Sequence, residues 1–389
     1  MGFKSFLIER ADSEEQLKHL EHAEDHVINA GPEGFVHAFH NLNDVHNKLK
    51  GEHNSAKVTM KYDGSPSVVF GHHPKTGKFF VASKSVFNKN PKVNYTDEDI
   101  EKNHGHAPGL VSKLKAALKH LPKVSPKKGV YQGDLMHTPE DLVHEKGKVS
   151  FTPNTITYSV PADSAHGQAA RKSKLGIAVH TAYEGKDLES MKAKYAPDLS
   201  HFNDHKDVHM ISTNHDVRKA KYTPEQQKRF VHHMKIATKE YEGLPKKGFD
   251  ALEGHRIPLK TYINATVRHG TSPSVEGFQQ HYEQSHMKKV DAVKTDKAKA
   301  AKTETMKADL KHIDKNKEHF ASILRMHDHL QKAKDITTNA LSSHSDFEHT
   351  IAGKKTKPEG FVVVRDNRPT KFVDRADFSA ANFNKERTV

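Results

Sequence analysis

The sequence contains no cysteine and no tryptophan among its 389 residues. The absence of cysteine excludes a disulfide framework, a thiolate zinc site, an iron–sulfur cluster and a cysteine nucleophile. No apolar run approaches the ~18–20 residues that a helix needs to cross a bilayer, so we expect no membrane span. A Gly-rich phosphate loop of the Walker type is also missing, which argues against an ATPase motor. These absences fit a reducing, cytoplasmic setting.

Positive charge is the most prominent property of the residues that are present. The chain has 62 Lys and Arg against 49 Asp and Glu, a net charge of +13, and 32 histidines that gain charge at acidic pH. Such an excess favours a polyanionic partner, nucleic acid above all, although it can also serve solubility alone. The excess is concentrated in residues 221–355, where 25 Lys and Arg face 17 Asp and Glu.

The order of helical and strand-like segments predicts an insertion. Residues 12–50 have helical spacing, interrupted at Pro32, and β-branched and aromatic runs between Gly and Pro turns predict strands within 57–183. A helical stretch is predicted between these strands, at residues 95–121. The strand pattern stops near residue 190 and resumes at 358–374, after a Lys- and Ala-rich helical stretch.

These changes in composition predict that the chain has three parts. An N-terminal helical segment occupies 1–54, a core is formed by 55–190 together with 355–389, and a basic helical domain at 191–354 is inserted into that core.

One short motif stands out among the predicted strands. Lys61-Tyr62-Asp63-Gly64 lies between two strand-like runs, and on its own such a pattern is typical of a surface turn. The motif becomes more specific because other characteristic segments follow it in a fixed order. These are Ser83-Lys84-Ser85, the strand ending at Asp134, the strand carrying His180, Glu359-Gly360-Phe361-Val362 and Lys371-Phe372-Val373.

This order resembles the covalent nucleotidyltransferase superfamily, which includes ATP-dependent DNA ligases, RNA ligases and mRNA capping enzymes. The resemblance implies an α+β fold: a nucleotidyltransferase core (ATP-grasp-like ligase adenylation core) of antiparallel sheets with helices. A large helical domain would be inserted into this core, and no C-terminal OB-fold would follow. The implied catalytic residue is Lys61, which would attack the α-phosphate of ATP and carry AMP as a phosphoramidate. ATP and Mg²⁺, with Mn²⁺ as an alternative, are the implied cofactors.

The resemblance also assigns residues to the nucleotide. Asp134 and Glu359 would bind the metal, with Asp134 standing where the family usually has Glu. His180 would stack on the base, and Lys371 would orient the α-phosphate. The complete implied nucleotide-binding set is Thr59, Met60, Asp63, Gly64, Lys84, Asp134, His180, Glu359 and Lys371.

A lysine at its ordinary pKa of ~10.4 is an ammonium at neutral pH and cannot attack phosphorus. We therefore expect burial and the neighbouring cations Lys84 and Lys371 to lower the pKa of Lys61.

Two departures from the family pattern guide the choice of substrate. The late motif has only one lysine, Lys371, so Arg365 or Arg368 is a candidate for the second phosphate contact. Only 18 residues follow Lys371, too few for an OB-fold, and this is similar to phage-type RNA ligases with helical accessory domains.

The expected function is an ATP-dependent polynucleotide ligase that joins 5′-phosphate and 3′-hydroxyl ends, with RNA-containing strands favoured. A DNA nick ligase is the nearest alternative, and a capping guanylyltransferase is a weaker one. A non-catalytic nucleic-acid-binding protein with a decayed ligase fold is the alternative from another class. We expect a monomer that acts on nicked or broken nucleic acid without a membrane, in the host cell cytoplasm if the ligase is phage-encoded. The histidines at 201, 205 and 209 are expected to be solvated.

Overall fold

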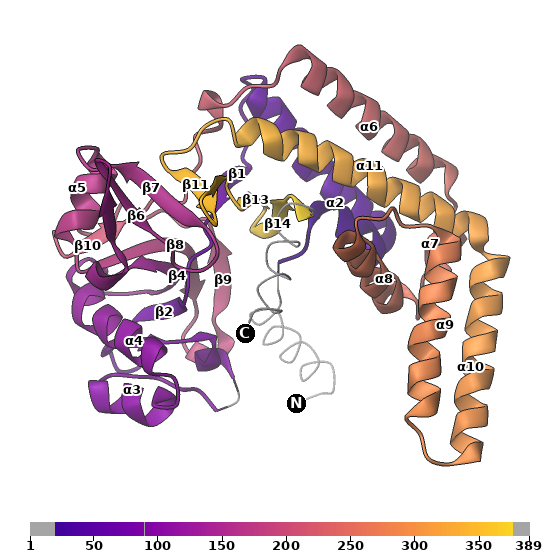
Figure 1. Ribbon diagram of the computed structural model, residues 1–389, viewed down its shortest axis with the longest axis horizontal. Helices are drawn as coiled ribbons and strands as arrows, with labels where there is room; N and C mark the ends of the chain where they lie inside the picture. The colour runs from indigo at the N-terminus through magenta and orange to yellow at the C-terminus, as the bar shows by residue number, and fades with distance from the viewer. Residues whose placement is uncertain (1–19, 89, 376–389) are drawn as a thin grey trace. The chain divides into compact units, whose positions relative to one another are not determined.

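The computed structural model describes residues 20–88 and 90–375, which form two compact units (Figure 1). Unit 1 consists of Ser55–Lys219 and His344–Pro369 and contains nearly all of the strands. Unit 2 consists of Glu21–Asn54, Ala220–Ser343 and 370–375, and is mainly helical. The predicted α+β class is confirmed.

The main sheet of unit 1 has six strands in the order β10-β8-β4-β2-β3, with β9 on β8. All neighbours are antiparallel except β10, which runs parallel to β8. The strands are β2 (Ser67–His72), β3 (Phe79–Ala82), β4 (Val130–His137), β8 (Leu175–Glu184), β9 (Lys192–Tyr195) and β10 (Val208–Met210).

Both faces of this sheet are buried. Val68 and Phe70 of β2 point into a cluster with α4 (Pro108–His120), whereas Val69 between them joins a second cluster on the opposite face. The apolar residues of α4 recur at helical spacing, so one side of the helix packs on the sheet. The shorter α3 (Asp97–His104) precedes α4 and begins at a capping box on Thr96. Burial on two faces explains why Val68, Val69 and Phe70 of β2 are apolar in succession and do not alternate with polar residues.

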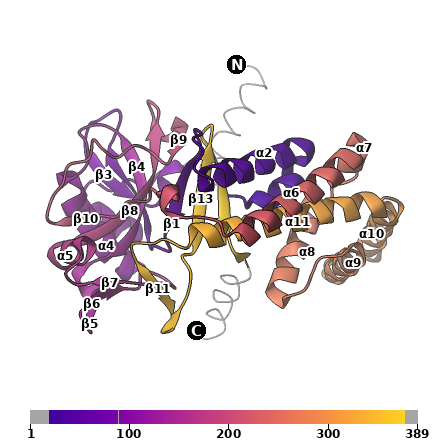
Figure 2. The same cartoon turned by 90° about the horizontal axis from the view of Figure 1, so that it is seen from above.

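A second sheet of unit 1 has the order β12-β11-β7-β6-β5 and carries α5 (Ala165–Lys172) against β6 and β7 (Figure 2). Its strands are β5 (Val143–Glu145), β6 (Lys148–Phe151), β7 (Thr157–Pro161), β11 (Glu348–Ile351) and β12 (Lys354–Lys355).

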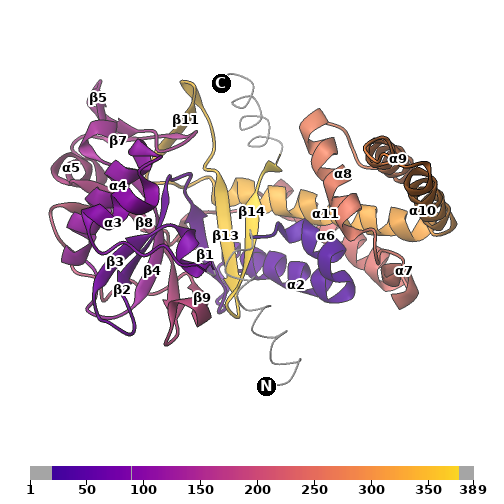
Figure 3. The same ribbon diagram turned by 90° about the horizontal axis from the view of Figure 1, so that it is seen from below.

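A separate antiparallel pair joins β1 (Lys57–Lys61) to β13 (Gly360–Arg365), which lie side by side in Figure 3. The register runs from Lys57 opposite Val364 to Lys61 opposite Gly360. The chain then leaves unit 1 within β14 (Arg368–Val373).

The helices of unit 2 are amphipathic, and α11 (Lys317–Leu341) packs against both α2 (His26–Leu49) and α6 (Pro224–Gly243). The predicted break near Pro32 is a kink within α2, where Gly31 has a positive φ of 57°. A pair formed by α9 (Val275–Asp291) and α10 (Asp296–Lys315) extends unit 2 (Figure 1). The remaining helices are α7 (Lys246–Asp250) and α8 (Arg256–His269).

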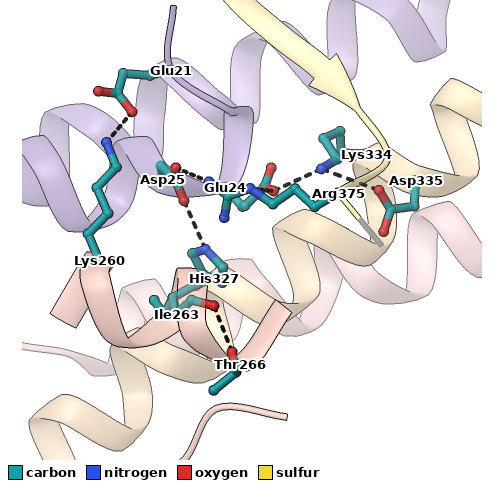
Figure 4. Close-up of polar contacts among 10 residues, drawn as sticks. All are labelled: Glu21, Glu24, Asp25, Lys260, Ile263, Thr266, His327, Lys334, Asp335 and Arg375. Carbon is teal, nitrogen blue, oxygen red and sulfur yellow. Dashed lines mark hydrogen bonds and ion pairs between the residues drawn. The ribbon is translucent and has the colours of Figure 1, made fainter. Parts of the chain in front are cut away.

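A buried ionic network connects the helices of unit 2 (Figure 4). The fully buried Lys334 ammonium lies 2.8 Å from a carboxylate oxygen of Glu24, which is also fully buried. Asp25 contacts His327 at 3.1 Å and also pairs with Arg375. Because buried charges are costly unless they are paired, this network requires its partners to be present together.

The domain boundaries differ from the predicted ones. Residues 21–54 belong to the helical unit, because buried apolar side chains of α2 such as Ile28 and Leu42 pack within it. The inserted segment is Ala220–Ser343, since β9, β10 and β11 extend the sheets of unit 1. The predicted helical residues 12–19 and the predicted core residues 376–389 lie outside the described residues. Within the described ranges, no helix is both long and apolar enough to cross a membrane.

Candidate active site

The predicted nucleophile and a predicted metal ligand meet at one end of the β1–β13 pair. Lys61 is the last residue of β1 and is paired with Gly360, so Glu359 is brought directly beside it. The Lys61 Nζ lies 2.5 Å from Oε1 and 2.6 Å from Oε2 of Glu359. Both side chains are half-buried, with 29% of Lys61 and 17% of Glu359 exposed, so the pair is partly shielded but still accessible to a ligand.

The two residues before Lys61 hold β1 in place from both sides. The Thr59 hydroxyl donates to the Val362 carbonyl of β13 at 3.3 Å, and the Met60 backbone N–H donates to the Thr213 carbonyl at 2.7 Å. Both side chains are buried. Their predicted contact with a nucleotide stays a prediction, and the observed contacts fix the strand that presents Lys61.

Asp63 anchors the turn that follows Lys61. Its carboxylate accepts hydrogen bonds from the Asn154 side chain at 2.8 Å and from the Thr155 and Ile156 backbones at 2.7 and 3.1 Å. Its own backbone N–H donates to the Tyr158 hydroxyl at 2.7 Å. These partners, about ninety residues away in the sequence, were not predicted, because nothing in their local pattern marks them. The Asp63 carboxylate therefore ties the turn after Lys61 to the second sheet.

Gly64 is required by close packing against another predicted site residue. A Cβ added at Gly64 would lie 2.6 Å from the Cβ of Asp134 and 2.9 Å from the sulfur of Met136. Neither contact is sterically possible unless the turn or β4 shifts. The absence of a side chain at Gly64 thus lets the Lys61 turn approach the strand that carries Asp134.

Asp134 and His180 form a second polar pair in the same unit. The strands β4 and β8 pair next to a bulge, and Nε2 of His180 lies 3.5 Å from Oδ1 of Asp134. Burial would raise the pKa of Asp134, but His180, the Ser67 hydroxyl and the charge of Lys61 outweigh it and lower that pKa. Asp134 is therefore an anion, and His180, expected to stack on a base, is a neighbour of this carboxylate.

The expectation for the Lys61 ammonium was wrong. Burial favours a lower pKa of Lys61, but the charge and hydrogen bonds of Glu359, helped by Asp134 and Asp63, raise it above its ordinary value. The sequence prediction counted the nearby cations and omitted the three carboxylates that face the lysine. Lys61 is thus held as an ammonium in this structure.

The remaining predicted cations lie at different positions. Lys84 begins the short helix after β3, at the end of the sheet where Ser67 pairs with Asp134, and no ion pair of its side chain is found within the described ranges. Lys371 lies in unit 2, where its backbone N–H donates to the Glu21 carbonyl at 2.8 Å, so its role beside Lys61 stays a prediction.

Of the two candidates for the second phosphate contact, Arg365 is the less suitable. It lies at the far end of β13, ~16 Å along the strand from the residue paired with Lys61. Arg368 begins β14, and its predicted role is untested.

The acidic groups around Lys61 fit a magnesium ion chemically. Three carboxylates, those of Glu359, Asp134 and Asp63, act on one lysine, which leaves excess negative charge. Because Asp63 is occupied by backbone and amide donors, Asp134 and Glu359 are the candidate ligands. No cluster of three or more metal-binding side chains occurs in the described part of the chain. Mg²⁺ needs only one or two carboxylates when phosphates and water complete its shell.

A buried histidine chain in unit 1 corrects the expectation for His209, whereas His201 is exposed as expected and His205 is half-buried. His209 is buried and lies 3.1 Å from His137 and 2.9 Å from His166, measured between ring nitrogens. Burial lowers the pKa of His137 to about 4 and that of His209 to about 3, so both rings are neutral at pH 7. The exposed His201 also contacts the Tyr131 hydroxyl, at 2.8 Å.

Comparison with known proteins gives one match. Residues 16–387 match the model of a protein family described as a family of unknown function (DUF6267). The searches of curated proteins and of solved structures found no match. Since the matched region covers almost all of the sequence, the chain belongs to the DUF6267 family.

Proposed function

We propose that this protein is an ATP-dependent polynucleotide ligase with a nucleotidyltransferase core, in which Lys61 carries AMP. The observation that supports the proposal most is the Lys61–Glu359 pair, held at the joined ends of β1 and β13 at 2.5 Å. The Lys-x-Asp-Gly and Glu-Gly-x-Val segments, 298 residues apart, each supply one member of this pair. Their meeting accords with the motif order that characterises covalent nucleotidyltransferases.

In the first step, Nζ of Lys61 attacks the α-phosphate of ATP. A nitrogen–phosphorus bond forms, the bond from the α-phosphorus to the pyrophosphate oxygen breaks, and pyrophosphate leaves. The Nζ ammonium must lose one proton before it can attack, and the nearest acceptor is the Glu359 carboxylate, already hydrogen-bonded to it. The second proton leaves the nitrogen as the phosphoramidate forms, and the departing pyrophosphate can take it. Glu359 therefore keeps the resting lysine protonated and is also placed to accept its proton.

Asp134 and Glu359 would hold the magnesium ion that accompanies the nucleotide. When bound, the metal neutralises phosphate charge and polarises the reacting phosphoryl group. His180 beside Asp134 keeps that carboxylate ionised, and Gly64 leaves room for it next to the Lys61 turn. These residues thus prepare an anionic site before any ligand arrives.

In the second and third steps, AMP passes to a 5′-phosphate end and a 3′-hydroxyl then displaces AMP. These steps require a bound nucleic acid. The charge of the helical insertion supports this requirement, because Ala220–Ser343 contains 23 Lys and Arg against 15 Asp and Glu. We favour RNA or RNA-containing strands, with a DNA nick as the alternative substrate.

The proposal is tested by incubating the protein with α-labelled ATP or GTP and Mg²⁺, followed by a denaturing gel. We expect a labelled protein band with ATP that disappears in Lys61→Ala. Lys57→Ala is the matched control, since Lys57 lies on the same strand and donates to the Ala196 carbonyl, away from Glu359. Labelling by GTP alone would favour a capping reaction. No labelling by either nucleotide, combined with strand binding, would favour the non-catalytic alternative.

Ligation of matched RNA and DNA substrates then identifies the strand. Each substrate has the same sequence, a single nick and a labelled 5′-phosphate. We expect sealing of the RNA-containing nick to be faster. Faster sealing of the all-DNA nick would assign the protein to the DNA ligases.

A further inference from the structure

A groove in unit 2 lies between α2 and α6 and has a volume of about 790 Å³. Its lining includes Phe39, Asn43, His46 and Phe230, together with the cations Lys235 and Lys239 and the carboxylate of Glu242. The volume falls within the ~300–1,000 Å³ that is usual for small-molecule pockets. The groove therefore has room for groups of the size of a nucleotide base.

The floor of the groove is aromatic. The rings of His46 and Phe230 are stacked, with centroids 4.4 Å apart and planes 7° apart, and both side chains are buried. Phe39 is only half-buried, so part of its ring remains available to a ligand. Val231, which also lines the groove, is 51% exposed. The exposed part of the Phe39 ring suits the stacking of an unpaired base, with the buried His46 and Phe230 rings beneath the groove.

A row of basic residues lies along α6, one of the two helices that form the groove. Lys228, His232, Lys235 and Lys239 recur at helical spacing on α6, and all four are exposed. No carboxylate lies within ion-pair distance of these three lysines in the described part of unit 2. The row spans ~16 Å at ~1.5 Å per residue. That length corresponds to about five nucleotides at a rise of ~3.4 Å each.

Exposed cations without acidic partners beside an aromatic groove are complementary to a polyanion that carries flat apolar groups. A duplex exposes its phosphates but keeps the faces of its bases stacked inside. It could therefore contact the row of lysines on α6 but could not place a base in the groove. An unpaired strand can use both features. We propose that the α2–α6 groove binds single-stranded nucleic acid, with bases against Phe39 and phosphates along Lys228, Lys235 and Lys239. This inference rests on the proposed function in that it names the strand-binding surface of the ligase.

The test measures strand binding by the full chain in the absence of ATP. Fluorescein-labelled (U)15, (dT)15 and a 15-base-pair duplex are titrated by anisotropy across a range of salt. The triple variant Lys228→Gln, Lys235→Gln, Lys239→Gln should bind single strands about 100-fold more weakly at ~0.1 M salt, with a salt slope smaller by about 2. The matched control is Lys297→Gln, Lys302→Gln, Lys307→Gln, which makes the same charge change at exposed sites on α10 and should bind like the wild type.

A second variant separates stacking from charge. Phe39→Ala should weaken single-strand binding at least about 5-fold without changing the salt slope. Its control is Ile257→Ala, which removes a side chain that is 80% exposed on α8. Thermal unfolding by circular dichroism verifies that each variant is folded.

The outcomes separate this inference from the proposed function. Wild-type affinity in the triple Gln variant, or loss of duplex binding alone, would overturn the groove assignment. An effect of the triple variant with no effect of Phe39→Ala would overturn the placement of bases. Labelling of Lys61 by ATP is measured separately, so a protein that binds strands through the groove but is never labelled would refute only the ligase proposal.

Discussion

The Lys61 ammonium contacts both oxygens of the Glu359 carboxylate, at 2.5 and 2.6 Å, although 298 residues separate them. This contact raises the pKa of Lys61 despite partial burial, which alone would lower it. The resting lysine is therefore charged. The proposed attack on ATP requires that Glu359 either accept the proton of Lys61 or release the ammonium when the nucleotide binds.

Replacement of Glu359 tests this dual role. Glu359→Gln keeps the size of the side chain but removes both the proton acceptor and a candidate metal ligand. We expect the rate of Lys61 adenylation to fall by about 10²–10⁴, the usual contribution of a general base. The rate is measured by single-turnover labelling with α-labelled ATP.

The control for this variant is Glu348→Gln, which changes an exposed glutamate paired with Lys148 in the same unit. It should adenylate at the wild-type rate. A Glu359→Gln rate within twofold of wild type would contradict the role assigned to Glu359. In the wild type, the rate should also rise with pH through the neutral range, because more of the Lys61 amine is then deprotonated.

Gly64→Ala tests the close approach of the Lys61 turn to β4. The new Cβ would lie 2.6 Å from that of Asp134, so either the turn or the strand must move. We expect a loss of about 1–3 kcal/mol in the free energy of unfolding and at least a tenfold loss of adenylation. Gly77→Ala, at an open turn with φ of 69°, is the comparison for backbone strain without crowding. Equal adenylation rates in the two variants would count against the packing argument.

The buried Lys334–Glu24 pair can be tested by a double-mutant cycle that measures the free energy of unfolding. Lys334→Met leaves Glu24 buried with one cation fewer, which should cost about 3–5 kcal/mol of unfolding free energy. Adding Glu24→Gln removes the uncompensated charge, so the double variant should be more stable than Lys334→Met alone. Urea unfolding is followed by circular dichroism, since the chain has no tryptophan. Simple addition of the two single-variant losses would show that the residues do not interact.

Asp335 predicts an unusual pH dependence. Burial, with help from Glu24 and Asp374, raises the pKa of Asp335 to about 7 against an opposing effect of Lys334. The folded protein therefore keeps this proton up to neutral pH, whereas the unfolded chain loses it near pH 3.8. The contribution of Asp335 to stability is thus full below about pH 4 and is lost as pH rises to about 7.

The Asp335→Asn side chain cannot titrate. The unfolding free energy of this variant, relative to the wild type, should therefore increase by about 1–3 kcal/mol from pH 5 to pH 8. The measurement is the unfolding free energy at both pH values, with Asp328→Asn as an exposed control on the same helix. A stability difference that does not change with pH would refute the assignment.

The sequence predicted strands and helices well where the apolar pattern was strong. The strand runs around Lys61, Val69 and Phe361 and the helix leading to His120 are confirmed. Their apolar residues recur at the period of the element that they form. The outer boundaries of the insertion were not predicted correctly, because β9 and β10 are short and only pairing with the sheet stabilises them.

At the candidate site, too, some features could be predicted from the sequence and others could not. The ordered motifs identified Lys61 and Glu359, and the β1–β13 register brings them together. The sequence could not reveal that carboxylates outnumber cations around Lys61, since this depends on distances across the fold. No sequence pattern distinguishes Lys334 from the other lysines of the insertion, and only its buried partners do so.

The most direct test of the account is the mass of the intact protein after incubation with ATP and Mg²⁺, followed by peptide mapping at alkaline pH to preserve a phosphoramidate. We expect a mass gain of one AMP on the peptide that contains Lys61, and no gain in Lys61→Ala. An unchanged mass with both ATP and GTP, or an AMP adduct on a different residue, would contradict it.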